Sequence, residues 1–359
     1  MTTPHNANEP LTYASSGVDL NARRSVVERY RDAARHAGRP EVLSGIDPFA
    51  GLFALGAGKY KDPVLVSSTD GVGTKTKLAG LVGRYESLGQ DIVANCVNDA
   101  LTTGAEPLFF LDYIGSSDLP ADAKVAIVKG IADACAEIGC ALLGGETADM
   151  PGVYPPGEFD LVGFVVGAVE RDRLIDGTRI AAGDLLFALP SNGLHTNGYS
   201  LARAALGIGM HEDGAASDRD RLLRYEPDLG ATLAGALLAP HICYVNALKP
   251  ALKLSDSDGR PLIKGLAHIT GGGLEENVPR ILPAGLGARF QRNSWPVPPI
   301  FGRVQQAGAI DDAEMDRVFN MGLGMIIAVG PEDARALTSA LPEAIEVGLV
   351  SIATGVAFT

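Results

Sequence analysis

A short apolar run that ends in an acidic, glycine-containing turn is the feature that most constrains this chain. Residues 63–66 (PVLV) predict a buried strand, and the turn 67–77 (SSTDGVGTKTK) follows it. Asp70 supplies a carboxylate, while Gly71 and Gly73 let the backbone bend and approach a ligand closely. This combination suits Mg²⁺-bound phosphates, because Mg²⁺ shares oxygen ligands with phosphates and turn amides can face the phosphate oxygens. The alternative is an ordinary turn with solvated lysines, and the Walker A pattern is absent.

The alternation of strand and helix continues after this turn. Helices are predicted at 19–37, 87–103 and 120–138, and strands at 108–114, 140–143 and 159–169. Strands followed by acids or glycines, with helices between them, predict an α/β layer that binds ligands at the carboxyl ends of its strands. A charged stretch after residue 170 marks a domain boundary, and a strand at 185–189 opens a second α/β domain. We therefore divide the chain into a disordered tail (1–10), a first domain (11–171) and a second domain (172–359).

The composition of the chain excludes several classes of protein. With 359 residues, 46% of them hydrophobic and 20% charged, the chain is long enough for two globular domains. A net charge of -13 argues against nucleic-acid binding, which needs a basic surface. The four cysteines form no C-x-x-C motif, which argues against a zinc site or a disulfide framework. The longest apolar run, 161–169, is too short for a membrane span, and the N-terminus lacks a secretory signal, so we expect a cytoplasmic protein without a membrane partner.

Three acids occupy positions that a metal site would need. Asp70 and Glu146 follow predicted strands, and Asp99 lies on the helix at 87–103. Convergence of the three carboxylates would hold Mg²⁺, whereas separately each could cap a helix or accept turn amides. The same helix carries a polar stripe that includes Asn98. Its lack of lysine and arginine favours the wall of a binding site over a solvated face.

The second half contributes a glycine-rich segment and a histidine loop. Residues 270–273 (TGGG) precede a predicted helix, so free amides and the positive helix end can hold an anion, with a plain turn as the alternative. His195 lies in the loop 191–200 among asparagines, glycines and hydroxyl groups. A lone histidine is more often structural; the functional alternatives are a ligand contact and a general acid or base, for which no orienting partner is evident.

Six segments together carry a family resemblance. They are 69–75 (TDGVGTK), 96–113 (CVNDALTTGAEPLFFLDY), 144–154 (GGETADMPGVY), 191–201 (SNGLHTNGYSL), 268–283 (HITGGGLEENVPRILP) and 319–325 (FNMGLGM). In order and spacing they resemble the phosphoribosylformylglycinamidine cyclo-ligases, also called aminoimidazole ribonucleotide synthetases. The likeness extends from about residue 13 to the C-terminus, and several motifs are too long to agree by chance.

The resemblance implies an ATP-dependent ring closure in purine biosynthesis. In the family, ATP activates the formyl amide oxygen of formylglycinamidine ribonucleotide, an amidine nitrogen attacks, and phosphate and ADP are released as the aminoimidazole ring forms. The resemblance also implies a homodimer in which the N-terminal sheets of two subunits join into a barrel near the ATP sites. The C-terminal domain is expected to be an α/β sheet flanked by helices.

The resemblance also assigns roles to individual residues. ATP contacts are expected from Asp70, Gly71, Gly73, Thr74, Lys75 and Asn98, and Mg²⁺ contacts from Asp70, Asp99 and Glu146. Substrate contacts are expected from His195, Asn197, Thr270, Gly271, Gly272 and Gly273, and catalytic roles from His195, Lys75 and Asp99. The segment 45–55 departs from the family, with Asp47 and Pro48 where glycines are usual, which leaves the motion of a flap there open.

Three other interpretations compete with this one. A selenophosphate synthetase relative would need a reactive cysteine in a glycine-rich N-terminal segment, but no cysteine precedes Cys96. A thiamine-phosphate kinase relative would share the acids but not the loop motif at 191–201. A nucleotide-binding regulator without activity would keep the glycines at 271–273 but lose one of the acids, and all three acids are present.

Overall fold

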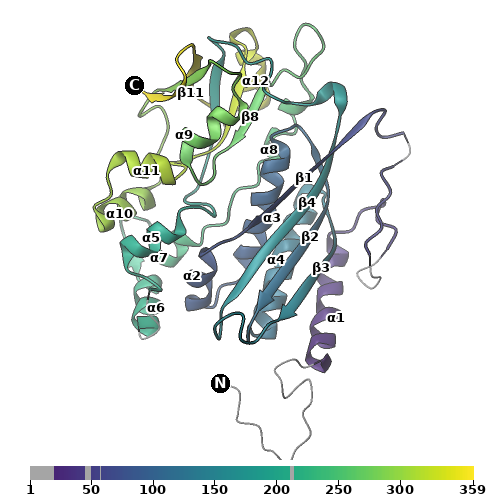
Figure 1. The fold of residues 1–359 in the computed structure, drawn as a ribbon, viewed down its shortest axis with the longest axis vertical. Coiled ribbons are helices and arrows are strands. Elements are labelled where there is room, and N and C mark those ends of the chain that lie inside the picture. Colours follow the sequence, from purple (N-terminus) through teal and green to yellow (C-terminus); the bar gives the residue numbers. More distant parts are fainter. Residues whose placement is uncertain (1–19, 45–49, 57, 211–213) are drawn as a thin grey trace, which may run out of the picture.

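A computed structural model describes residues 20–44, 50–56, 58–210 and 214–359 of the chain (Figure 1). The predicted tail at 1–10 and the flap residues Asp47 and Pro48 lie outside the described residues. Two sheets organise the described part, one in each half of the chain. No helix among the described residues has the length and apolar character needed to cross a membrane.

The first half contains a four-stranded sheet in the order β1-β4-β2-β3. Its elements are α1 (Leu20–His36), β1 (Pro63–Gly71), α2 (Lys75–Val82), α3 (Glu86–Leu101), β2 (Glu106–Ser116), α4 (Ala121–Ile138), β3 (Ala141–Asp149) and β4 (Phe159–Glu170). The predicted strands and long helices are thus confirmed. Strand β4 runs antiparallel between β1 and β2, so β1, β2 and β3 share one direction and their carboxyl ends lie along one edge. Strand β1 is longer than predicted, because its polar residues 67–70 continue the pairing with β4.

Helices α3 and α4 cover one face of this sheet, whereas no described helix covers the other face (Figure 1). The two helices pack backbone against backbone where Gly89 meets Gly130. A Cβ atom on Gly89 would lie 2.2 Å from the Ile127 carbonyl oxygen, and one on Gly130 would lie 2.1 Å from the Glu86 carbonyl oxygen. The two glycines therefore allow α3, which carries Asp99, to pack closely against α4.

The second half contains a six-stranded sheet in the order β12-β9-β11-β5-β10-β8. Its strands are β5 (Leu185–Pro190), β8 (Gly265–His268), β9 (Gly287–Phe290), β10 (Leu323–Val329), β11 (Ile345–Ser351) and β12 (Gly355–Phe358). Its helices are α5 (Tyr199–Leu206), α6 (Ala215–Leu223), α7 (Leu233–Leu237), α8 (Val245–Leu248), α9 (Gly273–Asn277), α10 (Pro299–Gly308), α11 (Asp312–Val318) and α12 (Ala334–Ala340). A small hairpin, β6 (Tyr225–Glu226) with β7 (Ala231–Thr232), lies apart from both sheets. Every pairing in the large sheet is antiparallel except β12 with β9, so this half is α+β in character.

The two halves share one hydrophobic core. A continuous cluster of buried apolar side chains extends from the helices behind the first sheet into the second half. Helix α3 contacts both α8 and β8, so the second sheet ends beside the helix that carries Asp99 (Figure 1). This contact brings segments from both halves to one place.

Candidate active site

Two of the predicted acids lie close together at the end of β1. The Asp99 Oδ2 atom lies 3.3 Å from the Ser68 hydroxyl of β1, and its Oδ1 atom lies 2.8 Å from His268 Nδ1. Burial raises the pKa of Asp70 above its usual value, and the negative charge of Asp99 adds to that rise. Two carboxylates that disfavour each other's charge are stabilised by a cation between them. The arrangement fits Mg²⁺ held by one or two carboxylates together with phosphate oxygens.

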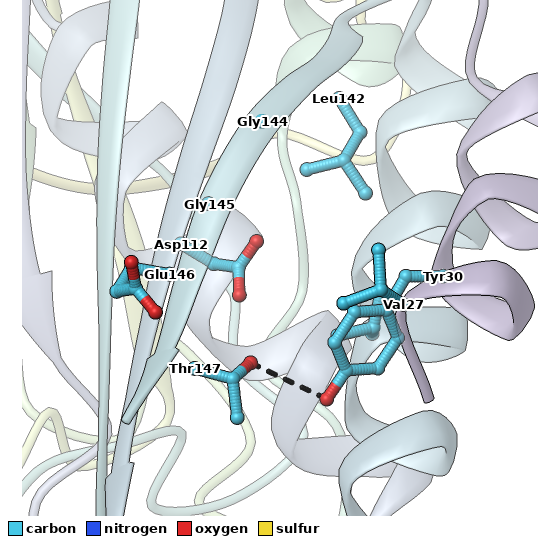
Figure 2. A pocket seen from close by; sticks show the side chains of 9 residues that line it. Val27, Tyr30, Asp112, Leu142, Gly144, Gly145, Glu146 and Thr147 are labelled. Carbon is cyan, nitrogen blue, oxygen red and sulfur yellow. Dashed lines mark hydrogen bonds between the residues drawn. The ribbon is translucent and has the colours of Figure 1, made fainter. Parts of the chain in front are cut away.

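Glu146 does not join this pair within the chain. Strand β3 lies at the opposite edge of the sheet from β1, three strand spacings or about 14 Å away. Figure 2 shows Glu146 on the opposite side of β3 from Thr147, whose hydroxyl lies 3.3 Å from the Tyr30 hydroxyl. No group of three or more metal-binding side chains occurs among the described residues. The predicted convergence of three acids is therefore wrong for a single chain, because β4 and β2 separate β1 from β3.

The turn after β1 contains an exposed glycine. Gly73 has φ +66°, a left-handed conformation that favours glycine, and it is exposed. The Gly71 N–H donates to Asp70 Oδ1 at 2.7 Å, which fixes that carboxylate at the start of the turn. Thr74 Oγ1 lies 3.3 Å from Ser200 Oγ, so the turn meets the N-terminus of α5 in the second half.

Lys75 lies inside the protein rather than in the turn. Its side chain is 0% exposed and its ammonium group pairs with Asp91 on α3, with Nζ 2.9 Å from Oδ1 and 2.8 Å from Oδ2. The same ammonium donates to the carbonyl oxygens of His195 at 3.0 Å and Ala239 at 2.9 Å. All its protons are used, so the expected contact of Lys75 with phosphate is replaced by a contact that joins the two halves.

Asn98 has a similar connecting role. It is buried, its Oδ1 accepts from the Tyr244 N–H at 2.9 Å, and its Nδ2 donates to the Ile242 carbonyl at 2.8 Å. Asp91 likewise accepts from the His241 N–H at 2.8 Å. The polar stripe of α3 therefore binds the segment 239–244 of the second half, and Asn98 is not free to contact ATP in this arrangement.

His195 is buried, although its loop consists largely of asparagines, glycines and residues with hydroxyl groups. It is 1% exposed, and both ring nitrogens lack a hydrogen-bond partner among the described residues. Its φ of 59° is left-handed, which costs a residue with a side chain about 1–2 kcal/mol. The ring stacks on His241 with centroids 4.0 Å apart and planes 19° apart. Burial lowers the pKa of His195 well below its usual value, which favours a neutral ring.

A chain of hydrogen-bonded side chains links the acids to the histidine loop. His268 Nδ1 contacts Asp99, and its Nε2 lies 3.1 Å from His241 Nε2. His241 Nδ1 lies 3.3 Å from Thr196 Oγ1, which also accepts from Asn197 Nδ2 at 3.4 Å. His268 ends β8, so this chain also adjoins the glycine segment.

The three glycines of the segment 270–273 differ in how much space surrounds them. A Cβ atom on Gly271 would meet only Asn197 Oδ1, at 3.4 Å. Gly272 has φ +95°, and its Cβ would lie 2.6 Å from the Glu276 side chain. A Cβ on Gly273 would lie 1.9 Å from the Asp316 carbonyl oxygen, so that glycine is required by packing. Asn277 Nδ2 fixes the backbone of the segment by donating to the carbonyl oxygens of Thr270, Gly271 and Gly273.

Models of two protein-family domains match this chain. They are the N-terminal domain of AIR synthase related proteins, at residues 50–169, and the C-terminal domain of the same proteins, at 181–355. The phosphoribosylformylglycinamidine cyclo-ligase of Geobacillus thermodenitrificans is 50% identical over 351 residues, which cover 97% of each chain. The chain belongs to the phosphoribosylformylglycinamidine cyclo-ligase family. The cyclo-ligase of Xanthomonas oryzae pv. oryzae is 49% identical over 331 residues, covering 92% of this chain and 93% of its own.

Solved structures outside the cyclo-ligases share the fold. Thiamine-monophosphate kinase from Stenotrophomonas maltophilia has a TM-score of 0.64 at 16% identity, covering 93% of this chain and 95% of its own. Hydrogenase maturation protein HypE in complex with ATP has a TM-score of 0.61 at 19% identity, covering 94% and 88%. At these identities the likeness supports the two-domain α/β architecture of the cyclo-ligase family and nothing finer.

The sequence does not single out three of the residues that build this candidate site. Asp91 lies on the polar stripe of the helix predicted at 87–103, and His268 begins the family motif at 268–283 that also contains the glycines. His241 lies in a segment (LAPHICY) without any motif or periodicity. Proximity to residues 270–273 could have drawn attention to His268, but no signal in the sequence points to His241.

Proposed function

We propose that this chain closes the ring of formylglycinamidine ribonucleotide with ATP, giving aminoimidazole ribonucleotide, ADP and phosphate in purine biosynthesis. One geometric observation carries the proposal. The carboxylates of Asp70 and Asp99 lie at one end of a continuous set of side-chain contacts, and the open glycine at Gly271 lies at the other. A nucleotide and a phosphorylated substrate can therefore face each other across this site. The names of relatives at about half identity over nearly the whole chain support the same reaction.

The reaction explains why such a site needs two anion-binding ends. An amide oxygen is a poor leaving group, and transfer of the terminal phosphoryl group of ATP to it makes phosphate the leaving group. The amidine nitrogen of the same substrate must then lie against the activated carbon. Because both groups belong to one molecule, the attack is already unimolecular, and the site contributes by holding the two groups in a reactive orientation.

At the nucleotide end, we propose that Asp70 and Asp99 bind Mg²⁺ with the phosphates of ATP. Bound there, Mg²⁺ would neutralise charge on the phosphates during transfer. The turn of Gly71, Gly73 and Thr74 adjoins Asp70, and Gly73 is exposed, so its backbone amide can face the phosphate oxygens. Lys75 and Asn98 then serve ATP binding indirectly, by holding the second half against α3.

At the substrate end, we propose that residues 270–273 and Asn197 bind the ribonucleotide. The N–H groups of Gly271 and Gly272 donate to no protein acceptor among the described residues, so they are available to a phosphate. Asn197 is half-buried beside Gly271 and presents its Oδ1 toward it. In this arrangement the role of His195 is to fix the backbone of the loop. Its carbonyl oxygen accepts from the Lys75 ammonium group and from the Tyr199 hydroxyl, which lies 3.1 Å away.

We propose that the chain is a homodimer joined through the helix-free face of the first sheet. Leu65 on β1 is 62% exposed on that face, and Phe164 on β4 is 37% exposed there. A partner sheet packed on this face would cover these apolar side chains and form the barrel expected for the family. Glu146 also points to this face, so a partner chain would lie near it.

Two further assignments follow from the same proposal. The nucleotide-binding and dimerisation domain is residues 11–171, and the second domain is 172–359, because the two sheets share no strand and the connection between β4 and β5 lies at 171–184. The compartment is the cytoplasm, where thiols stay reduced. All four cysteines are free, and three of them are buried.

The proposed reaction is tested by measuring ADP release from the purified protein with a coupled assay. We expect release only when formylglycinamidine ribonucleotide and Mg²⁺ are both present, with one ADP formed for each ring closed. Thiamine monophosphate and other small acceptors serve as comparison substrates. Turnover of one of these, with none of the ribonucleotide, would refute the proposed reaction.

A further inference from the structure

A buried histidine, His241, joins the two ends of the proposed site. It comes from the segment 239–244, which is held on α3 by Asp91 and Asn98. One ring nitrogen faces His268 and the other faces Thr196. No other described side chain contacts both His268 and Thr196 by hydrogen bonds. His241 therefore lies within hydrogen-bond distance of both His268 at the acid end and Thr196 at the loop end.

The hydrogen bonds around His241 determine which ring nitrogen carries its proton. Asn98 is oriented by two backbone groups, so its Nδ2 must be the atom that lies 3.3 Å from His241 Nε2. An amide nitrogen only donates, so His241 Nε2 is an acceptor. The proton of a neutral His241 is then on Nδ1, which donates to Thr196 Oγ1. Burial holds the pKa of His241 well below its usual value, in keeping with a neutral ring.

The neighbours of His241 lie within hydrogen-bond distance of one another. His268 Nε2 lies 3.1 Å from the same His241 nitrogen, and His268 Nδ1 lies 2.8 Å from Asp99 Oδ1. Thr196 Oγ1 already accepts from His241 and from Asn197. The hydroxyl proton of Thr196 is therefore left to be donated to a ligand.

We propose that His241 is a positioning residue of the ring-closing reaction. Its Nε2 holds the His268–Asp99 pair at the nucleotide end, and its Nδ1–H orients the Thr196 hydroxyl toward the ribonucleotide. This inference rests on the proposed function for the identity of the two ligands. The juxtaposition of His268, His241 and Thr196 does not depend on that identity.

Two substitutions of His241 test its contact with Thr196 and its contact with His268 separately. In His241→Gln the amide lies at the level of Nε2, so its oxygen can still accept from His268 and Asn98, but nothing donates to Thr196. In His241→Asn the amide lies at the level of Nδ1, so it can still donate to Thr196, but His268 loses its acceptor. Ile242→Val is the matched control, because it lies in the same segment and its side chain takes no part in these hydrogen bonds.

The measurement is steady-state turnover of the full-length variants with each ligand varied in turn. We expect His241→Gln to raise KM for the ribonucleotide about tenfold, with KM for ATP within about twofold of wild type. His241→Asn should raise KM for ATP about tenfold and leave the other within about twofold. Ile242→Val should change neither. Equal effects of both variants on both constants, or no effect, would overturn the proposal.

The protonation pattern gives a second test that needs neither variant nor turnover. In ¹⁵N-labelled wild-type protein, the His241 ring should show a protonated Nδ1 and an unprotonated Nε2 at neutral pH. A proton on Nε2, or on both nitrogens, would overturn the inference. Wild-type protein that shows the expected tautomer but no turnover of the ribonucleotide would refute the proposed function instead, so the two failures are distinguishable.

Discussion

Replacing Lys75 with methionine tests whether this lysine binds phosphate or joins the two halves. The substitution keeps the length and the apolar part of the side chain but removes the ammonium group that contacts Asp91 and the carbonyls of His195 and Ala239. Asp91 is also fully buried, so its charge is left without compensation. Burial already lowers the pKa of Lys75 and raises the pKa of Asp91, because it disfavours both charges.

The expected loss follows from these contacts. Removing one partner of a buried ion pair costs about 3–5 kcal/mol, and each carbonyl that loses its donor adds about 1 kcal/mol. The free energy of unfolding should therefore fall by about 5–7 kcal/mol, a large part of the stability of an ordinary domain. Adding Asp91→Asn should recover about 2–3 kcal/mol, because the uncompensated charge is then gone while the oxygen that accepts from the His241 N–H remains.

The assay is urea unfolding followed by circular dichroism and by the fluorescence of Trp295. Lys77→Met is the matched control, since Lys77 is partly exposed and pairs with Glu158 at the surface, so its loss should change stability by less than about 1 kcal/mol. If Lys75→Met keeps the urea midpoint of the wild type and yet loses ATP-dependent turnover, the lysine binds phosphate and its role in joining the two halves is refuted.

Three further predictions concern other parts of the molecule. Burial raises the pKa of Asp112, in the pocket of Figure 2, to about 7, so the folded chain binds an extra proton between about pH 4 and 7 and loses stability as the pH rises through that window. Asp112→Asn should therefore raise the urea midpoint at pH 8 and not near pH 4; a gain independent of pH would contradict this. Gly271→Val should raise KM for the ribonucleotide with an unchanged melting temperature, whereas Gly272→Val should lower the melting temperature because its φ is left-handed; unchanged substrate affinity in Gly271→Val would remove this glycine from the binding site. Phe164→Asp should convert the proposed dimer into monomers in sedimentation velocity, and a dimer that persists would place the interface elsewhere.

The sequence predicts the positions of helices and strands better than it predicts which of them contact one another. The apolar runs and the helical periodicity of α3 and α4 were sufficient to find these elements within a few residues. The open turn after β1 and the glycine segment were also predictable, because glycine clusters signal close approach whatever lies nearby. Family motifs then supplied the chemistry.

The errors concern long-range contacts. A lysine after a glycine turn is typical of a solvated or phosphate-binding group, and nothing near Lys75 in the sequence reveals that its partners are Asp91 and the carbonyls of residues 195 and 239. The sequence groups Glu146 with Asp70 because both follow predicted strands, whereas in the structure both lie within strands. Strand order decides their separation, and the sequence does not reveal that β4 inserts between β1 and β2. His241 has no local pattern at all, so only the packed structure brings it into the site.

The central claim is that Asp70 and Asp99 together hold the metal-bound nucleotide. It is tested most directly by calorimetric titration of a non-hydrolysable ATP analogue into wild type, Asp70→Asn and Asp99→Asn, each with and without Mg²⁺. We predict that Mg²⁺ strengthens binding to the wild type by at least about tenfold and that this dependence disappears in both variants. Variants that keep the wild-type dependence on Mg²⁺ would contradict the claim.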